Sequence, residues 1–391
     1  MTNLRRLARA LPLLLVAFLA TGAPAGAHGQ TAACLAPDRV AATRERMRQV
    51  VDSVLHSRAD LPGISVYVEA AGLCLTWSGS AGVSDLATGK TLSVDQPFRI
   101  ASNTKTYVAA ATLRLIEDGR LKLDDPIARR LPKEYVDRLR AGGYDLNRIT
   151  IRHLLSHTSG LYDYAMDPAF MTAVMAEPGK RWTRLEQVEF ALAKGKPYGE
   201  PGQVFHYADT GYILLGEIIE RITGKGLGPA LRDLLGYQRL QLTSTWLETL
   251  EPAPQGVAGR AHQYMDSTDT FAMDPSLDLY GGGGLVATPR DMMTFLRGLF
   301  TGRIYRKPST LQTMLTTPFP GAQRDYRLGI YPFTVDGERG WGHTGFWNTF
   351  AFYWPDRDIG ISLAVTQQGQ GNASRALLTS LYRVVREASG K

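Results

Sequence analysis

Apolar residues recur at helical spacing in several separate segments of this 391-residue chain. The spacing predicts helices over residues 41–57, 103–117, 151–156, 185–194, 210–223, 226–235 and 373–388. A further helix is expected to begin at Thr288, a favourable N-cap that Pro289 follows in the first helical position. Residues 281–284 are a glycine run, which permits either a hinge or a close approach of two backbones.

Strand patterns, in contrast, lie toward the two ends of the chain. Alternating or β-branched runs predict strands over residues 64–69, 73–77, 79–83, 326–331, 340–344, 348–354 and 359–366. Strands at both ends with helices between them predict an α+β fold: an antiparallel sheet flanked by N- and C-terminal helices, with an all-helical lobe inserted. We expect an α/β lobe of about residues 35–100 and 285–391 and a helical lobe of about residues 101–284.

The first residues have the pattern of a secretory signal. Three arginines lie among the first nine residues, residues 10–20 form an apolar run too short to span a bilayer, and Ala25-Gly-Ala27 offers a cleavage site. We therefore expect residues 1–27 to be a signal peptide. Residues 28–391 would then be a single exported domain, periplasmic or extracellular, without a stable membrane anchor.

Charge and cysteine content refine this expectation. The formal net charge of +7 falls to +4 without the leader's three arginines, and no block of Lys and Arg follows, so nucleic acid is not an expected partner. Cys34 and Cys74 are the only cysteines, and such a pair in an exported protein favours a disulfide. Lipidation of Cys34 and two free thiols are the alternatives, although no apolar residue stands three positions before Cys34.

Ser102 and Lys105 are the first candidates for chemistry, since they form the only Ser-x-x-Lys sequence of the chain. The unpaired N–H groups at a helix N-terminus stabilise negative charge, so an alkoxide on Ser102 would be favoured there. A spacing of three places the Lys105 amine over the same helix face. A hydroxyl, a nearby base and a backbone anion site are the parts of an acyl-transfer nucleophile. Taken alone, the pair is equally consistent with a capping serine and a solvated lysine.

Two further motifs indicate a functional site only when they are considered together with Ser102 and Lys105. Tyr207 and Asp209 precede a predicted helix whose expected N-cap is Thr210; alone, they are more typical of an aromatic contact and a carboxylate at a helix start. His343 lies in the glycine-rich stretch 340–346, which predicts an edge strand with room for a ligand backbone or, alone, an ordinary turn.

Together, Ser102-Asn-Thr-Lys105, Tyr207-Ala-Asp209 and His343-Thr-Gly345 resemble the motifs of the penicillin-recognising serine hydrolases in order and spacing. The resemblance is to the class C branch, which contains β-lactamases, DD-carboxypeptidases, esterases and D-aminopeptidases. Residues 154–161 and 282–288 also look like sequence of this family. The resemblance covers about residues 61–382 and implies the β-lactamase/DD-peptidase-like fold.

The resemblance also implies roles for individual residues. Ser102 would attack the substrate carbonyl and become acylated, while Lys105 and Tyr207 share the proton transfers. The N–H of Ser102 would be one oxyanion-hole donor. The substrate-binding residues and the second oxyanion donor would be Asp209, His343, Thr344, Gly345 and Phe346, with His343 and Thr344 meeting a substrate carboxylate and Phe346 giving its N–H. No metal or cofactor is implied, and the expected partner is a small-molecule or peptide substrate.

Two departures from the family pattern shape the functional expectation. Asp209 stands where Asn is usual, and His343 stands where β-lactamases usually carry Lys. We therefore expect a DD-carboxypeptidase acting on D-amino-acid peptides, with a β-lactamase or small-ester hydrolase as the alternative. Asp209 should pair with Lys105 and oppose the phenolate form of Tyr207, and His343 should titrate near neutrality. Deacylation should then be slow.

Three other classes fit the sequence less well. His153 and His157 have the spacing of zinc ligands, but the Glu of His-Glu-x-x-His is missing. An α/β-hydrolase would carry a Gly-x-Ser-x-Gly sequence, which this chain lacks. A non-catalytic penicillin- or peptidoglycan-binding protein on the same fold stays open, because Asp209 could mark a loss of activity; formation of an acyl-enzyme would separate the two.

Overall fold

A seven-stranded antiparallel sheet joins the two ends of the chain in the order β3-β2-β1-β12-β11-β10-β9. The computed structural model describes residues 34–318 and 325–390, so the expected signal peptide lies outside the described residues. The strands of this sheet are β1 (Gly63–Ala70), β2 (Leu75–Asp85), β3 (Lys90–Thr91), β9 (Tyr331–Val335), β10 (Glu338–Gly345), β11 (Thr349–Trp354) and β12 (Ile359–Val365). Val66 of β1 lies opposite Leu363 of β12, so the N-terminal hairpin and the C-terminal strands form one continuous sheet.

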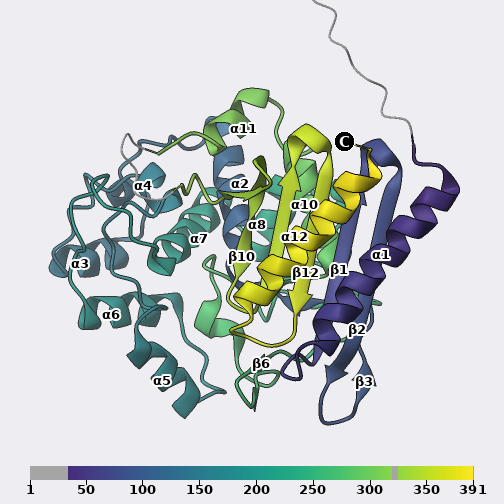
Figure 1. The fold of residues 1–391 in the computed structure, drawn as a ribbon. Coiled ribbons are helices and arrows are strands. Elements are labelled where there is room, and N and C mark those ends of the chain that lie inside the picture. The colour runs from purple at the N-terminus through teal and green to yellow at the C-terminus, as the bar shows by residue number, and fades with distance from the viewer. Residues whose placement is uncertain (1–33, 319–324, 391) are drawn as a thin grey trace, which may run out of the picture. The chain divides into compact units, whose positions relative to one another are not determined.

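Helices cover both faces of this sheet and fill the middle of the chain (Figure 1). They are α1 (Pro37–His56), α2 (Thr104–Glu117), α3 (Lys133–Ala141), α4 (Ile151–Leu155), α5 (Pro168–Ala176), α6 (Arg184–Lys194), α7 (Asp209–Thr223), α8 (Leu227–Leu235), α9 (Tyr237–Leu240), α10 (Pro289–Phe300), α11 (Pro308–Met314) and α12 (Gly371–Ala388). Among the residues described, no helix has both the length and the apolar composition needed to cross a membrane.

The purple α1 and the yellow α12 lie side by side on one face of the sheet (Figure 1). Met47 and Val51 are one turn apart on α1, and Leu377 and Leu381 are one turn apart on α12. All four belong to one buried cluster with the sheet, as amphipathic helices require. On the opposite face, α10 packs against β11, β12 and β1. Since both faces are covered, β12 is buried along its whole length.

A small three-stranded sheet connects the two ends of the helical region. Its strands are β4 (Phe98–Arg99), β8 (Leu285–Ala287) and β5 (Trp246–Leu247), in the order β4-β8-β5; a separate hairpin joins β6 (Tyr264–Met265) to β7 (Thr268–Asp269). Phe98 pairs with Ala287, so the chain entering the helical region lies beside the chain leaving it. From this junction α2 runs inward, buried along nearly its whole length, and it packs against α7, α8 and α11.

The predicted α+β architecture is confirmed, and one predicted strand is wrong. Residues 326–331 were expected to be a strand, but the strand β9 begins only at Tyr331. The preceding segment is tied to the helices instead, since Gly329 has a positive φ of 74° and its N–H donates to Leu155 O at 3.1 Å. The Tyr326 side chain also turns inward and donates a hydrogen bond to His343. Tertiary contacts therefore override the local strand pattern there.

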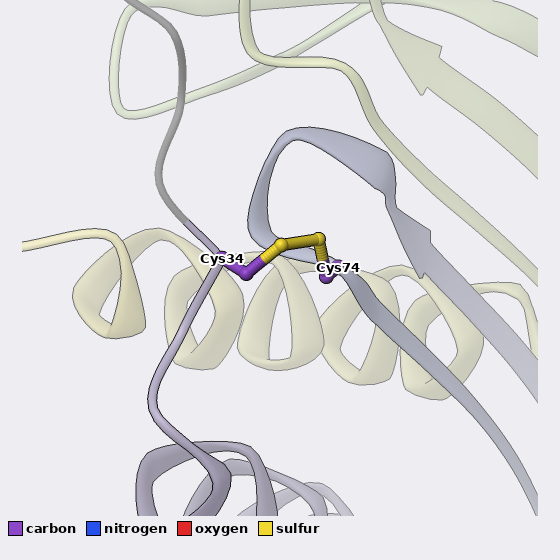
Figure 2. Close-up of a disulfide and its surroundings, with 2 residues drawn as sticks. All are labelled: Cys34 and Cys74. Carbon is purple, nitrogen blue, oxygen red and sulfur yellow. A yellow bond between two sulfur atoms is a disulfide. The ribbon is translucent and has the colours of Figure 1, made fainter.

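A disulfide joins Cys34, just before α1, to Cys74 at the turn between β1 and β2 (Figure 2). The two Cα atoms are 5.0 Å apart, and Leu35 N donates to Leu73 O beside the bridge at 3.1 Å. The bond therefore fixes the start of the described chain to the hairpin at the edge of the sheet. Neither cysteine is free in the structure.

Candidate active site

Ser102 lies in a strained turn directly before α2. The turn is a 3₁₀ helix, η2 (Ala101–Asn103), where the sequence predicted the start of the α-helix itself. Ala101 is 1% exposed and has a φ of 45°, a conformation that costs a non-glycine residue on the order of 1–3 kcal/mol. Buried Asn103 holds the turn, because its amide donates to Ile100 O and to Thr349 O on β11. The strained backbone places Ser102, which is partly exposed, directly before the N-terminus of α2.

Lys105 is fully buried and is surrounded by three oxygen atoms. Its Nζ atom donates hydrogen bonds to Ser102 Oγ at 2.8 Å and to Gly282 O at 2.6 Å. The same atom lies 2.5 Å from Asp209 Oδ1 in an ion pair, which confirms the predicted pairing. A buried ammonium group is stable only with such partners, and a lysine ammonium has three N–H donors and no lone pair. The arrangement therefore fits Lys105 as a cation that points one N–H at Ser102.

Gly282 reaches Lys105 because the glycine run of residues 281–284 brings two backbones together. A Cβ atom on Gly281 would lie 2.6 Å from Tyr212 O, and one on Gly282 would lie 3.3 Å from the Asp209 carboxyl group. Of the two uses open to the run, close approach is thus the one observed.

Asp209 is the first residue of α7, not the residue before its N-cap. Ala208 takes the N-cap position, and the Thr210 hydroxyl, which the sequence predicted as the cap, donates instead to Tyr162 O at 2.8 Å. Asp209 N donates to Asp163 Oδ1 at 2.7 Å. The carboxyl group of Asp163 therefore does the work of a cap for α7, which leaves the Asp209 side chain available to Lys105.

His157, which the sequence singled out only as a possible zinc ligand and as part of the stretch 154–161, holds the backbone on both sides of Tyr207. His206 N donates to His157 O at 2.8 Å, and Ala208 N donates to His157 Nδ1 at 3.0 Å. The His157 ring also lies against the Tyr207 ring, with centroids 4.1 Å apart. Burial and then the Lys105 charge hold the pKa of His157 well below its usual range, so it is a neutral imidazole that accepts at Nδ1.

The Tyr207 phenol is close to both Ser102 and Lys105. The Lys105 Nζ atom lies 5.0 Å from the centre of the Tyr207 ring. Burial, and after it the Asp209 charge, raises the pKa of Tyr207 well above its usual value, while a hydrogen bond with Ser102 lowers it. The predicted opposition between Asp209 and the phenolate is therefore confirmed in direction, and Tyr207 is a phenol at neutral pH.

His343 corrects one expectation of the sequence. It was expected to titrate near neutrality, but burial, followed by the Lys105 charge, lowers its pKa to about 3. The side chain is 3% exposed, its Nδ1–H donates to Thr344 O at 2.6 Å, and its Nε2 accepts from the Tyr326 hydroxyl at 3.0 Å. Since both ring nitrogens are satisfied by the protein, His343 is neutral and offers no charge to a ligand.

The end of β10 packs against the turn that carries Ser102. A Cβ atom on Gly345 would lie 2.3 Å from Ile100 O, so only glycine allows this approach. The Thr344 hydroxyl is 2.7 Å from the Tyr331 hydroxyl, and the Phe346 side chain, 41% exposed, follows at the surface. The sequence-predicted residues from three distant motifs are thus gathered around Ser102.

Two further carboxyl groups near Lys105 were not selected from the sequence. Burial, and then the Asp209 charge, raises the pKa values of Asp163 and Asp278 to about 7 each. Asp163 lies two residues after the stretch 154–161, and Asp278 lies three residues before the glycine run, so only their closeness to recognised motifs could have pointed to them.

The two histidines with zinc-ligand spacing have separate structural roles. The Nδ1 atom of His153 accepts from Thr150 N at 3.2 Å within the capping box of α4, whereas His157 supports the Tyr207 loop. In the part of the chain that the structure describes, no group of three or more His, Cys, Asp or Glu side chains is arranged so that it could hold a metal ion.

Comparisons with known proteins place this geometry in a family. The family model described as Beta-lactamase matches residues 43–383. The esterase EstB of Burkholderia gladioli is 34% identical over 230 residues, which cover 57% of this chain and 57% of that protein. The chain thus spans little more than half the length of this curated relative.

Solved structures align over more of the chain. A D-amino acid amidase from Ochrobactrum anthropi SV3, complexed with L-phenylalanine amide, matches with a TM-score of 0.74 and 25% identity over 89% of this chain and 99% of that chain. A D-stereospecific amidohydrolase from Streptomyces sp. matches with a TM-score of 0.71 and 27% identity over 85% of this chain and 97% of that chain.

Proposed function

Because this chain belongs to the Beta-lactamase family of serine hydrolases, we propose that it cleaves small amides and esters through an acyl-enzyme on Ser102. The proposed substrates are D-amino-acid amides and related donors whose leaving group carries no negative charge. The similarity to a D-amino acid amidase, a D-stereospecific amidohydrolase and an esterase supports this substrate class.

The observation that carries the proposal is that both ring nitrogens of His343 are hydrogen-bonded within the protein. The sequence placed His343 and Thr344 where a substrate carboxylate would bind, and a carboxylate leaving water needs a charged or strongly donating partner. His343 uses its one N–H on Thr344 O and accepts at its other nitrogen, so it cannot pair with an anion. A substrate with an amide or ester on the leaving side avoids this cost.

The hydrogen bonds around Ser102 suggest how its proton moves. Lys105 donates to Ser102 Oγ, so the serine hydroxyl is free to donate to the Tyr207 oxygen. As Ser102 Oγ bonds to the carbonyl carbon, its proton passes to Tyr207, and the phenol proton of Tyr207 passes to the leaving nitrogen or oxygen. Water would then attack the acyl-enzyme by the reverse relay. The N–H groups of Ser102 and Phe346 would hold the oxyanion.

A matched pair of substrates tests the preference for a neutral leaving group. A D-alanyl-D-alanine peptide with a free C-terminal carboxylate is compared with the same peptide carrying a C-terminal amide, and kcat/KM is measured for both. The amide should be cleaved at least about tenfold faster, a difference of about 1.4 kcal/mol in the transition state. Faster cleavage of the free acid would refute the proposal and support the carboxypeptidase.

Ser102→Ala provides the control for the reaction itself. The variant should lose both turnover and covalent labelling by a chromogenic ester, with its circular dichroism unchanged, because only a hydroxyl at a turn is removed. Labelling that persists in Ser102→Ala would place the nucleophile elsewhere.

The DD-carboxypeptidase expected from the sequence is the second candidate. Thr344, a partly exposed residue at the C-terminal end of β10, favours this candidate. Its hydroxyl could donate to a substrate carboxylate without the help of a charge. We also propose that the protein is exported, as the leader-like residues 1–27 and the Cys34–Cys74 disulfide suggest. Periplasmic or secreted protein of reduced mass, lacking residues 1–27, would support export, and unprocessed cytoplasmic protein would oppose it.

A further inference from the structure

Two further aspartates, Asp163 and Asp278, lie near the Lys105–Asp209 ion pair behind Ser102, and the Lys105 charge acts on the pKa of both. Asp209 forms the ion pair with Lys105, and its own N–H donates to Asp163. Asp278 lies against the next residue of the glycine run: a Cβ atom on Gly283 would be only 2.0 Å from Asp278 Oδ1. If all three carboxyl groups were ionised, this enclosed site would hold a net charge of about −2, which is costly in a low-dielectric environment.

The hydrogen bonds of the two extra carboxyl groups are not alike. Asp163 accepts from backbone N–H groups at both oxygens, from Asp209 N at 2.7 Å and from Met166 N at 3.0 Å. Two such donors favour the carboxylate form. Asp278 is partly exposed as a residue, yet its Oδ1 atom is buried and has no hydrogen-bond partner among the described residues. A carboxylate oxygen in that position would lose its hydration without compensation.

We propose that Asp278 is a positioning residue that stays a neutral carboxylic acid up to about neutral pH and becomes an anion above it. This inference rests on the proposed acyl-enzyme function of Ser102. Lys105 then faces two carboxylates, Asp209 and Asp163, and Asp278 carries the proton, so the net charge of the cluster is about −1 in place of −2.

The surrounding charges agree with this assignment. Burial and then Asp209 raise the pKa of Asp278 to about 7, while Lys105 and Arg99 lower it. The charged and titratable groups that face Asp278 are Asp209 at the start of α7, Lys105 on α2, Arg99 on β4, and Asp163 and Tyr164 in the loop between α4 and α5.

The protonation of Asp278 bears on the rate of acylation. The transition state of acyl transfer places negative charge on the substrate oxygen and on Ser102 Oγ. When Asp278 loses its proton above about pH 7, the site gains an anion that opposes this charge. Asn at this position has nearly the shape of the protonated carboxyl group and cannot ionise, so Asp278→Asn should reproduce the active state at every pH.

Infrared difference spectroscopy tests the protonation directly. The wild-type protein with ¹³C-labelled aspartate should show a carboxylic acid C=O band near pH 6 that disappears above about pH 8. Asp278→Asn should lack that band, and the matched control Asp356→Asn, which changes an exposed aspartate, should keep it. If Asp278→Asn does not fold, Asp278→Ala serves in its place. A band that survives in the Asp278 variant would overturn the assignment.

The acylation rate tests the functional consequence. The ratio of kcat/KM for Asp278→Asn to that for the wild type should be near one at about pH 6 and rise to about three- to tenfold at about pH 9. A ratio that does not change with pH would contradict the positioning role, since a merely structural change would lower activity equally at all pH values. If Ser102 forms no acyl-enzyme, the proposed function fails, and the infrared result still decides the protonation of Asp278.

Discussion

Replacing Asp278 by Asn should make the stability of the protein less sensitive to pH. Burial, followed by the Asp209 charge, raises the pKa of Asp278 to about 7 in the folded protein, against about 3.9 for an unfolded aspartate. Between these two values the folded state holds a proton that the unfolded state has released. The free energy of unfolding therefore falls as the pH rises through this window. Below about pH 4 Asp278 is protonated in both states, and its full contribution to the free energy of unfolding is present.

The size of the effect follows from the pKa difference. Each pH unit across the window is worth about 1.4 kcal/mol, so a difference of about three units gives up to about 4 kcal/mol for this single group. Between about pH 5 and pH 7 the wild type should lose about 2 kcal/mol through Asp278. Asp278→Asn has no such proton, so its stability relative to the wild type should increase by that amount over the same interval.

Urea denaturation at several pH values measures this difference, since unfolding free energies can be compared at constant m-value. Asp356→Asn is again the matched control, because its exposed side chain should leave the pH dependence unchanged. Parallel stability curves for the wild type and Asp278→Asn would refute the reasoning, because they would show that Asp278 titrates alike in the folded and unfolded states.

Three further substitutions test the site. Asp209→Asn removes an anion that raises the pKa of Tyr207, so the acyl-enzyme should decay about tenfold faster in single-turnover experiments; slower decay would contradict this role. His157→Leu removes the acceptor of the Ala208 N–H and should lower kcat about 100-fold with little change in KM. His157→Asn, whose Oδ1 atom can accept this hydrogen bond, should restore most of the rate. Equal losses of kcat in the two variants would argue against positioning. His343→Lys adds a cation and should shift the preference toward free carboxylate substrates by about tenfold, as competition between the amide and the free acid would reveal.

Hydrophobic patterns in the sequence predicted the architecture, and the resemblance of three motifs to a known family predicted that their residues would gather in one site. Hydrophobic periodicity located most helices and strands, and the order of Ser102, Tyr207 and His343 identified residues that the fold brings together. It also predicted the Lys105–Asp209 ion pair, since a lysine and an aspartate enclosed in one site must neutralise each other.

What the sequence did not predict depends on burial, which no local pattern specifies. His343 was expected to titrate near neutrality, yet enclosure beside Lys105 keeps it neutral. His157 acts on Tyr207 through the backbone of His206 and Ala208, 49 and 51 residues away in sequence, and spacing gives no sign of such contacts. Asp163 and Asp278 look like ordinary loop aspartates until the fold places them near one ammonium group.

The two departures from the family pattern change the charge of the site in the same direction. Asp209 in place of Asn adds one negative charge, and a neutral His343 in place of Lys removes one positive charge, so the site is two charge units more negative than the Lys and Asn pattern would make it. Such a site repels a substrate carboxylate and also opposes the oxyanion of acyl transfer. A third buried anion would increase both the repulsion of a substrate carboxylate and the destabilisation of the oxyanion. Protonation of Asp278 prevents this, and it therefore makes Asp209 compatible with a working serine nucleophile and with the neutral amide and ester substrates that we propose.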